Sequence, residues 1–110
     1  MNTKKELIGA STGLLILSVL AKEPSYGYQI IRNINQQGEG LFLWQEGTIY
    51  PVLHKLEQEE LVRAQWQQAD TGRERKYYYI TAKGRGALGE AAEQWRGFSQ
   101  LVLNLAGDAS

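Results

Sequence analysis

The stretch that decides the fold runs from Gln45 to Ile80 and reads QEGTIYPVLHKLEQEELVRAQWQQADTGRERKYYYI. Its first part, residues 45–57, places apolar side chains at positions 49, 52, 53 and 56, which is the spacing of one helical face. Two runs with a two-residue period follow, 61–66 and 76–80, and the turn-forming sequence Asp70-Thr71-Gly72-Arg73 separates them. A helix followed by a hairpin with cations at its tip is typical of a winged helix-turn-helix, in which the helix enters the major groove and the wing meets phosphate.

Two helices are expected before this stretch. Residues 5–21 form an apolar helical run, and Pro24 ends it because proline cannot continue a helix and biases the preceding residue away from the helical region. Ser25 is a natural N-cap for a second helix over residues 26–36, which the glycines at positions 38 and 40 break. Residues 41–44 then lead in extended form into the next helix, and we expect a short strand here that pairs with the wing.

The rest of the chain predicts one long final helix. Thr81 caps it, residues 82–105 form its body, and residues 107–110 are expected to be a frayed tail. The predicted fold class is therefore mainly α with a small β-hairpin. A winged helix-turn-helix occupies residues 1–81, and the C-terminal helix with its tail occupies residues 82–110.

The final helix carries an apolar stripe at the a and d spacing of a heptad repeat. A single helix beyond the wing has too little of its own domain to cover such a stripe, whereas the same helix of a second subunit would bury it about a two-fold axis. The alternative is that the stripe folds back onto the helix of residues 5–21 in its own chain. We favour a dimerisation helix, whose interface residues are Leu88, Ala91, Trp95, Phe98, Val102 and Leu105.

The candidate DNA-binding residues lie on the face of the 45–57 helix opposite its apolar positions. Polar side chains such as His54 and Lys55 hydrogen-bond base edges or phosphate, and Gly47 allows the backbone to approach the DNA closely. Tyr50 lies at the edge of this face, where we expect it to pack between helix and backbone. The alternative is an ordinary solvated face, against which the adjoining hairpin argues. The full set is Gly47, Thr48, Tyr50, Pro51, His54, Lys55 and Gln58.

Three cations, Arg73, Arg75 and Lys76, stand at the tip of the hairpin, where Asp70 and Glu74 counter part of their charge. Each phosphate contact would steepen the log–log salt dependence of DNA binding by about one unit. Because side chains alternate along a strand, only part of this set can point the same way, and we favour Arg73 and Lys76 as the phosphate contacts. The alternative is a charged edge that only keeps the hairpin soluble.

The chain resembles the PadR family of bacterial transcriptional regulators over roughly residues 8–105. The resemblance is carried by Leu14–Leu17 with Tyr26–Ile30, by Gly47–Leu53 with Leu56 and Glu57, and by Gly72-Arg73 with Tyr77–Thr81. The single helix after the wing is similar to the short subgroup of that family. One departure is Gln45-Glu46, which stands where the family often has Ser-Pro. It weakens the N-cap of the recognition helix and places a carboxylate near the DNA.

The resemblance also implies a ligand site, because members of the short subgroup sense hydrophobic, often cationic aromatic compounds in a cavity at the dimer interface. Carried over to this chain, the site would form around Trp95, with Phe98 and Leu15 as lining and with small neighbours at Ala91 and Ala92. An indole packs poorly about a two-fold axis, so two copies would flank a slot for a planar hydrophobic molecule. The alternative is that Trp95 only fills the core.

Composition narrows the classes of function. The 12 basic and 12 acidic residues balance, so any basic surface for nucleic acid must be local. With no cysteine and one histidine, we expect no cofactor, no metal site and no catalytic constellation, and therefore not an enzyme. The apolar run from Leu14 to Ala21 is too short to span a bilayer. We expect it to be a buried helix rather than a signal peptide, in a cytoplasmic protein without membrane contact.

Together these features favour a homodimeric transcriptional repressor that binds an inverted-repeat operator in double-stranded DNA. By the resemblance, a planar hydrophobic effector would release it. The rival from another class is a dimeric small-molecule-binding or adaptor protein without specific DNA binding. The neutral charge and the acidic residues Glu57, Glu59 and Glu60 argue for this rival.

Overall fold

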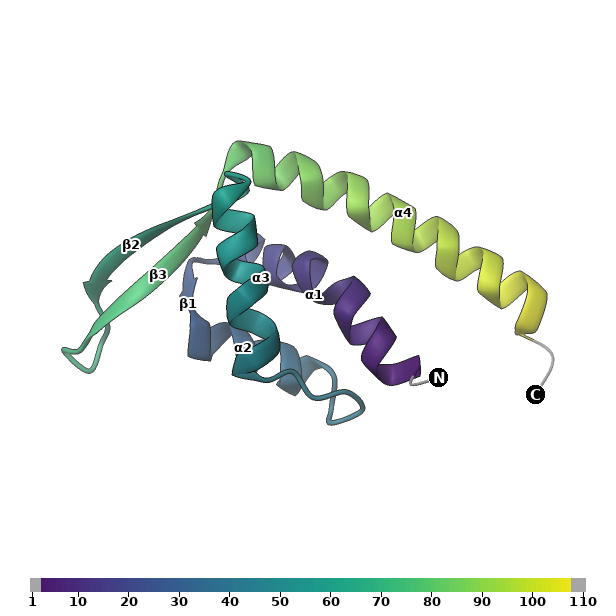
Figure 1. The fold of residues 1–110 in the computed structure, drawn as a ribbon, viewed down its shortest axis with the longest axis horizontal. Coiled ribbons are helices and arrows are strands. Elements are labelled where there is room, and N and C mark those ends of the chain that lie inside the picture. The colour runs from purple at the N-terminus through teal and green to yellow at the C-terminus, as the bar shows by residue number, and fades with distance from the viewer. Residues whose placement is uncertain (1–2, 108–110) are drawn as a thin grey trace.

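A computed structural model describes residues 3–107 of the chain. Within that range the elements follow in the order α1 (Thr3–Lys22), β1 (Ser25–Tyr26), α2 (Gly27–Gln37), α3 (Glu46–Gln58), β2 (Val62–Gln68), β3 (Glu74–Ile80) and α4 (Ala82–Ala106). The predicted fold class is confirmed, and the β2–β3 hairpin projects from one end of the helical body (Figure 1). The part of the predicted frayed tail beyond residue 107 lies outside the described residues.

The strands form one antiparallel sheet in the order β1-β3-β2. β2 and β3 are the predicted wing, with Val62 opposite Ile80 and Ala64 opposite Tyr78. The turn between them contains Gly72 at a φ of 86°, a conformation that glycine adopts without strain. Because alternate side chains share one face of a strand, the apolar positions nearest the base of the wing pack together against the helices.

The third strand comes from a different part of the chain than expected. The prediction that residues 41–44 pair with the wing was wrong, because β1, which directly precedes α2, pairs with β3 instead. The end of the 41–44 segment is held elsewhere. The backbone N–H of Trp44 donates to Asn35 Oδ1 at 2.8 Å, and the carbonyl of Trp44 accepts from Asn35 Nδ2 at 3.0 Å. These two bonds tie the segment to α2 rather than to the sheet.

The start of α2 also differs from the prediction. Tyr26, rather than Ser25, is the N-cap residue, and its backbone N–H donates to Gln29 Oε1 at 3.2 Å. Ser25 instead pairs with β3, and its hydroxyl donates to the carbonyl of Glu23. The short strand β1 has therefore moved the helix start one residue along the chain.

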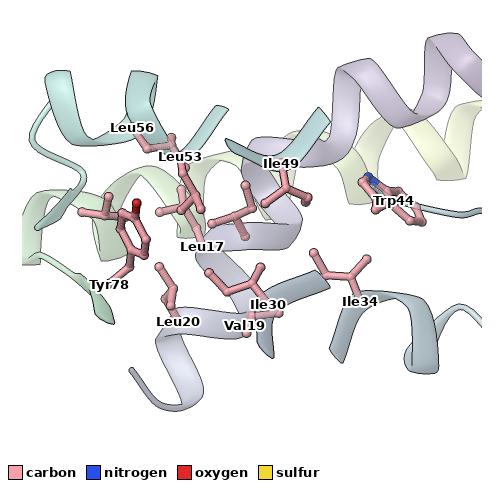
Figure 2. Packing of buried hydrophobic residues seen from close by; sticks show 12 residues of the cluster. Leu17, Val19, Leu20, Ile30, Ile34, Trp44, Ile49, Leu53, Leu56 and Tyr78 are labelled. Atoms are coloured by element: carbon pink, nitrogen blue, oxygen red, sulfur yellow. The ribbon is translucent and has the colours of Figure 1, made fainter. Parts of the chain in front are cut away.

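The hydrophobic core lies where α1, α2 and α3 meet and where the wing folds against them. Ile16, Ile49 and Leu53 are fully buried. Tyr78 reaches in from β3 at one end of the cluster and Trp44 lies at the other (Figure 2). The apolar face predicted for α3 is confirmed, since all four of its positions belong to the core or pack against it. The other buried members are Leu17, Val19, Leu20, Ile30, Ile34, Leu56 and Val62.

α4 begins at a tightly packed corner. Thr81 is its N-cap, as predicted: the hydroxyl oxygen accepts the N–H of Gly84 at 3.0 Å, and the hydroxyl donates to the carbonyl of Glu60 at 2.7 Å. Gly84 is buried against the carbonyl of Leu61, at a place where a Cβ atom would overlap that oxygen. This corner sets the direction in which α4 leaves the wing.

α4 runs antiparallel to α1 and contacts it (Figure 1). Near the start of α4, Leu88 packs against the core and the guanidinium of Arg85 donates to the carbonyl of Ala21 at 3.5 Å. Further along, the apolar side chains are open to solvent, with Phe98 59% exposed and Leu105 80% exposed. Neither α4 nor any other helix within residues 3–107 is both long and apolar enough to cross a bilayer.

Candidate nucleic-acid interface

The outer face of α3 presents the residues that the sequence singled out. His54, Lys55 and Gln58 are exposed, as are Gly47 and Pro51 nearer the start of the helix. The opposite face of the same helix is buried in the core, so the orientation of α3 about its axis is fixed. A helix held in this way can be laid into a major groove with its polar side chains toward the bases.

Thr48 and Tyr50 lie at the margin of this face, and each is half-buried. Tyr50 packs against the hydrophobic core. Its ring covers Gly27, the first residue of α2, where a Cβ atom would overlap the phenol ring and its hydroxyl. Gly27 thus permits the close crossing of α2 and α3. Sequence reasoning did not assign this role, although a glycine in the first turn of a helix was the available signal.

α3 starts without a side-chain cap, as its sequence predicted. Gln45 is the N-cap residue and its side chain makes no capping hydrogen bond, so only its backbone carbonyl accepts the N–H of Thr48 at 3.0 Å. Glu46 is exposed in the first turn, where a carboxylate stabilises the helix dipole. The same carboxylate repels any phosphate that approaches this helix end.

The three wing cations have different surroundings. Arg73 is exposed in the turn, and among residues 3–107 its guanidinium takes part in no ion pair. Arg75 lies with its guanidinium carbon 5.1 Å from the ring centre of Tyr26, a cation–π distance. Lys76 Nζ lies 3.7 Å from a carboxylate oxygen of Glu57 on α3. Of the two contacts favoured from sequence, Arg73 is therefore open to phosphate, while Lys76 already has a partner.

A polar cleft of about 410 Å³ lies between the wing, the start of α2 and the middle of α3. Trp66 on β2 lies in its wall and is 64% exposed, which sequence reasoning missed. Alternation places Trp66 on the face of the wing that carries Ala64, but the core ends before it reaches Trp66. Tyr78 also lines this cleft, and burial raises the pKa of its hydroxyl, which the carboxylate of Glu57 raises further.

This arrangement agrees with a comparison of the whole chain with known proteins. The model of the transcriptional regulator PadR-like family matches residues 16–90, which is more than half of the chain. The chain belongs to the PadR-like family. It is therefore a transcriptional regulator of the winged helix-turn-helix type, and the resemblance seen in its motifs is confirmed.

Two relatives of this PadR-like regulator span nearly its whole length. The transcriptional regulator Rv3488 of Mycobacterium tuberculosis is 30% identical, over 96% of this chain and 92% of its own. A solved PadR-like transcriptional regulator from Bacillus cereus shares 32% identity, with a TM-score of 0.81 over 91% of this chain and 95% of its own. By contrast, the chain spans 37% of the length of the transcriptional regulator YqjI of Escherichia coli, to which it is 30% identical.

In this PadR-like regulator the side chain of Trp95 lies half-buried between α4 and α1. Its ring meets that of Phe98 edge-on, with the ring centres 6.4 Å apart. A hollow of about 200 Å³ on one side includes Leu7, Phe42 and Trp44. A second hollow, of about 470 Å³, is lined by Ala10, Gly13, Leu14, Ala91, Gln94, Trp95 and Phe98.

Not every residue named for the ligand site lies in these hollows. Ala91 and Phe98 share one of them with Trp95, whereas Leu15 lines a separate cavity on another side of α1. Leu14, its neighbour, takes the place expected for Leu15. Ala92 is half-buried on α4 and lines neither hollow.

Proposed function

We propose that this PadR-like regulator binds an inverted-repeat operator in double-stranded DNA as a homodimer and represses transcription. The observation that carries the proposal is the exposed outer face of α3, whose orientation is fixed because the opposite face is buried. The wing that follows carries the exposed Arg73 in its turn. In this proposal α3 enters the major groove and the wing lies along the phosphates. Residues 1–81 form the DNA-binding domain, and residues 82–110 form the dimerisation segment.

The exposed second half of α4 supports the homodimer. Phe98, Val102 and Leu105 follow one helical stripe, and contiguous apolar patches of this kind on a monomer commonly mark interaction sites. The first part of the stripe is less available, because Leu88 packs against its own core and Trp95 lies against α1. The proposed interface therefore centres on the second half of α4, and its two-fold axis would place two copies of α3 for two half-sites.

A dimeric small-molecule-binding or adaptor protein without specific DNA binding is the second candidate. The balanced charge favours it, as does the ion pair that occupies Lys76 with Glu57. A fluorescence anisotropy titration with the DNA upstream of the protein's own gene distinguishes the two candidate functions. Saturable binding that unrelated duplex DNA does not displace supports the regulator. Equal affinity for both duplexes supports the second candidate.

Substitutions in the recognition helix and in the wing are expected to impair DNA binding in different ways. Lys55→Ala should change the ranking of operators that differ by one base pair, because base-edge contacts contribute about 1–3 kcal/mol of discrimination. Arg73→Ala should weaken all duplexes by a similar factor and lower the log–log salt slope by about one unit, because one phosphate contact is lost. Anisotropy titrations over a series of salt concentrations measure both effects.

Arg96→Ala is the matched control for these charge removals. Arg96 is exposed on α4 and pairs with Glu93 on the same helix, so its loss should leave operator affinity and salt slope unchanged. If Arg73→Ala altered sequence preference while Lys55→Ala did not, the roles given to helix and wing would be reversed.

We also propose an effector site between the subunits. Its ligand would be a planar hydrophobic molecule, such as a cationic aromatic compound, that stacks on Trp95. The half-buried indole, its edge-on neighbour Phe98 and the hollow beside Ala91 support this site. An effector here would lie against both α1 and α4, so it can favour one spacing of the two recognition helices over another.

Trp95→Ala is expected to reduce the affinity for a planar cationic dye by about 1–3 kcal/mol, because the stacking surface is lost. The fluorescence of the dye itself is the appropriate signal, because emission from the buried Trp44 overlaps emission from Trp95. Trp66→Ala, which removes an exposed indole from the wing, is the control and should leave dye affinity unchanged. Equal losses for the two variants would show that the dye does not bind at Trp95.

A further inference from the structure

A separate apolar cavity of about 310 Å³ lies between α1, α2 and the segment that leads into α3. Leu15 and Val19 of α1 face Ile34 of α2 across it, and Phe42 and Trp44 form a third wall. Its volume is at the lower end of the roughly 300–1,000 Å³ typical of ligand pockets. The cavity shares Phe42 and Trp44, but none of its other lining residues, with the hollow beside Trp95.

The walls of this cavity are held in place by hydrogen bonds. The indole N–H of Trp44 donates to the hydroxyl of Thr12 on α1 at 3.2 Å. The side chain of Asn35 on α2 bonds both backbone groups of Trp44, at 2.8 and 3.0 Å. Trp44 as a whole is 7% exposed, and its side chain lies close to Ile34 in the core (Figure 2). A ligand would therefore find a preformed site, which lowers the entropy lost on binding.

Polar residues complete the lining of the cavity. Lys22, the last residue of α1, is one of them; it is exposed, and within residues 3–107 it takes part in no ion pair. Asn33, which is half-buried, and Gln37, which is exposed, line the cavity from α2. Among the residues that the structure describes, no acidic residue lines the cavity. A mainly apolar lining with one exposed cation and two side-chain amides matches a ligand with a hydrocarbon body and an anionic head.

We propose that this cavity binds a small monocarboxylate, with its hydrocarbon chain between α1, α2 and Trp44 and its carboxylate at Lys22. Burial of the ligand's hydrocarbon chain supplies most of the affinity, at about 25 cal/mol for each Å² of apolar surface removed from water. The ammonium of Lys22 and the amide N–H groups select the anionic head. This ligand class has the opposite charge to the cationic aromatics proposed for Trp95, so the two sites are chemically distinct.

Suitable probes have the same alkyl chain and differ in the charge of the head group: octanoate, octanol and octyltrimethylammonium. Titration calorimetry with the wild-type chain gives the affinity for each. The Trp66→Phe, Trp95→Phe chain, whose remaining indole is Trp44, reports whether the ligand reaches the cavity. We expect octanoate to bind most tightly and to change Trp44 emission saturably. Neither measurement involves DNA, so its outcome is independent of the proposed operator binding.

Three variants locate the site. Lys22→Gln should weaken octanoate binding about fivefold and leave octanol unchanged, as for one partly exposed ion pair, while Lys22→Arg should retain the preference. Ser18→Leu places a larger apolar side chain in the cavity and should abolish binding of all three probes, with folding checked by circular dichroism. Equal affinity for the three probes would overturn the proposal, as would unchanged binding in Ser18→Leu. Binding that appears only in a monomeric variant would show that a second copy of the protein fills the cavity. This result would also overturn the proposal.

Discussion

Replacing Gly84 with alanine is expected to destabilise the folded chain by about 1–3 kcal/mol or more, the usual range for an overpacked site. The added Cβ would overlap the carbonyl oxygen of Leu61 and lie 2.8 Å from a side-chain carbon of Ile80. That carbonyl cannot move aside easily, because it accepts the N–H of Thr81 at 3.1 Å at the corner between wing and α4. Urea denaturation followed by circular dichroism measures the loss.

Gly86→Ala is the matched control, two residues further along the same helix. Within residues 3–107, no heavy atom apart from its chain neighbours and its own helix backbone lies within 4 Å of the position of its Cβ, so alanine fits there without strain. Alanine in a helix is favoured over glycine by about 0.5–1 kcal/mol, so this variant should be slightly more stable than wild type. Shifts of the same sign in both variants would contradict the packing described at Gly84.

α3 and the wing show what local patterns can predict. The spacing of apolar residues from Ile49 to Leu56 was enough to identify both the helix and its buried face, because that spacing places them on one side of any α-helix. The wing followed from alternation and from the turn at Gly72. In both elements the local preference and the tertiary packing agree, so nothing distant overrides the pattern.

The segment at residues 41–44 shows where such patterns end. Four apolar residues in a row fit an extended strand, but they fit equally well a connection that turns its large side chains into the core. The outcome depends on Asn35, whose side chain bonds the backbone of Trp44, and on Thr12, which accepts from its indole. These partners lie on other helices, so a local pattern cannot identify them.

The candidate site was predictable as a face but not as a set of contacts. The exposed positions of α3 followed from its periodicity, whereas the ion pair of Lys76 with Glu57 depends on how the wing packs against that helix. In the same way, the choice between Leu14 and Leu15 beside Trp95 depends on the rotation of α1, which a run of consecutive leucines leaves open. Side-chain partners across elements are set by tertiary packing.

The largest expected effect on function belongs to Phe98→Glu combined with Val102→Glu. These side chains are 59% and 44% exposed in the single chain, so the change should leave the fold intact, unlike a change at Trp95, which contacts α1. In the proposed dimer the two carboxylates would be buried without partners. An unpaired buried charge costs about 3–5 kcal/mol, so the dimer dissociation constant should rise more than about a hundredfold.

Sedimentation velocity at micromolar concentration should therefore show a dimer for the wild-type chain and a monomer for the double variant. The log–log salt slope of operator binding should fall to about half, because one subunit makes half of the phosphate contacts. Gln100→Glu with Asn104→Glu adds the same charges at the same spacing on the opposite face of α4, where both side chains are exposed, and should leave the dimer unchanged. A monomeric wild-type chain would contradict the dimer outright. Monomers from both double variants would show that added charge, rather than the Phe98 stripe, is what separates the subunits.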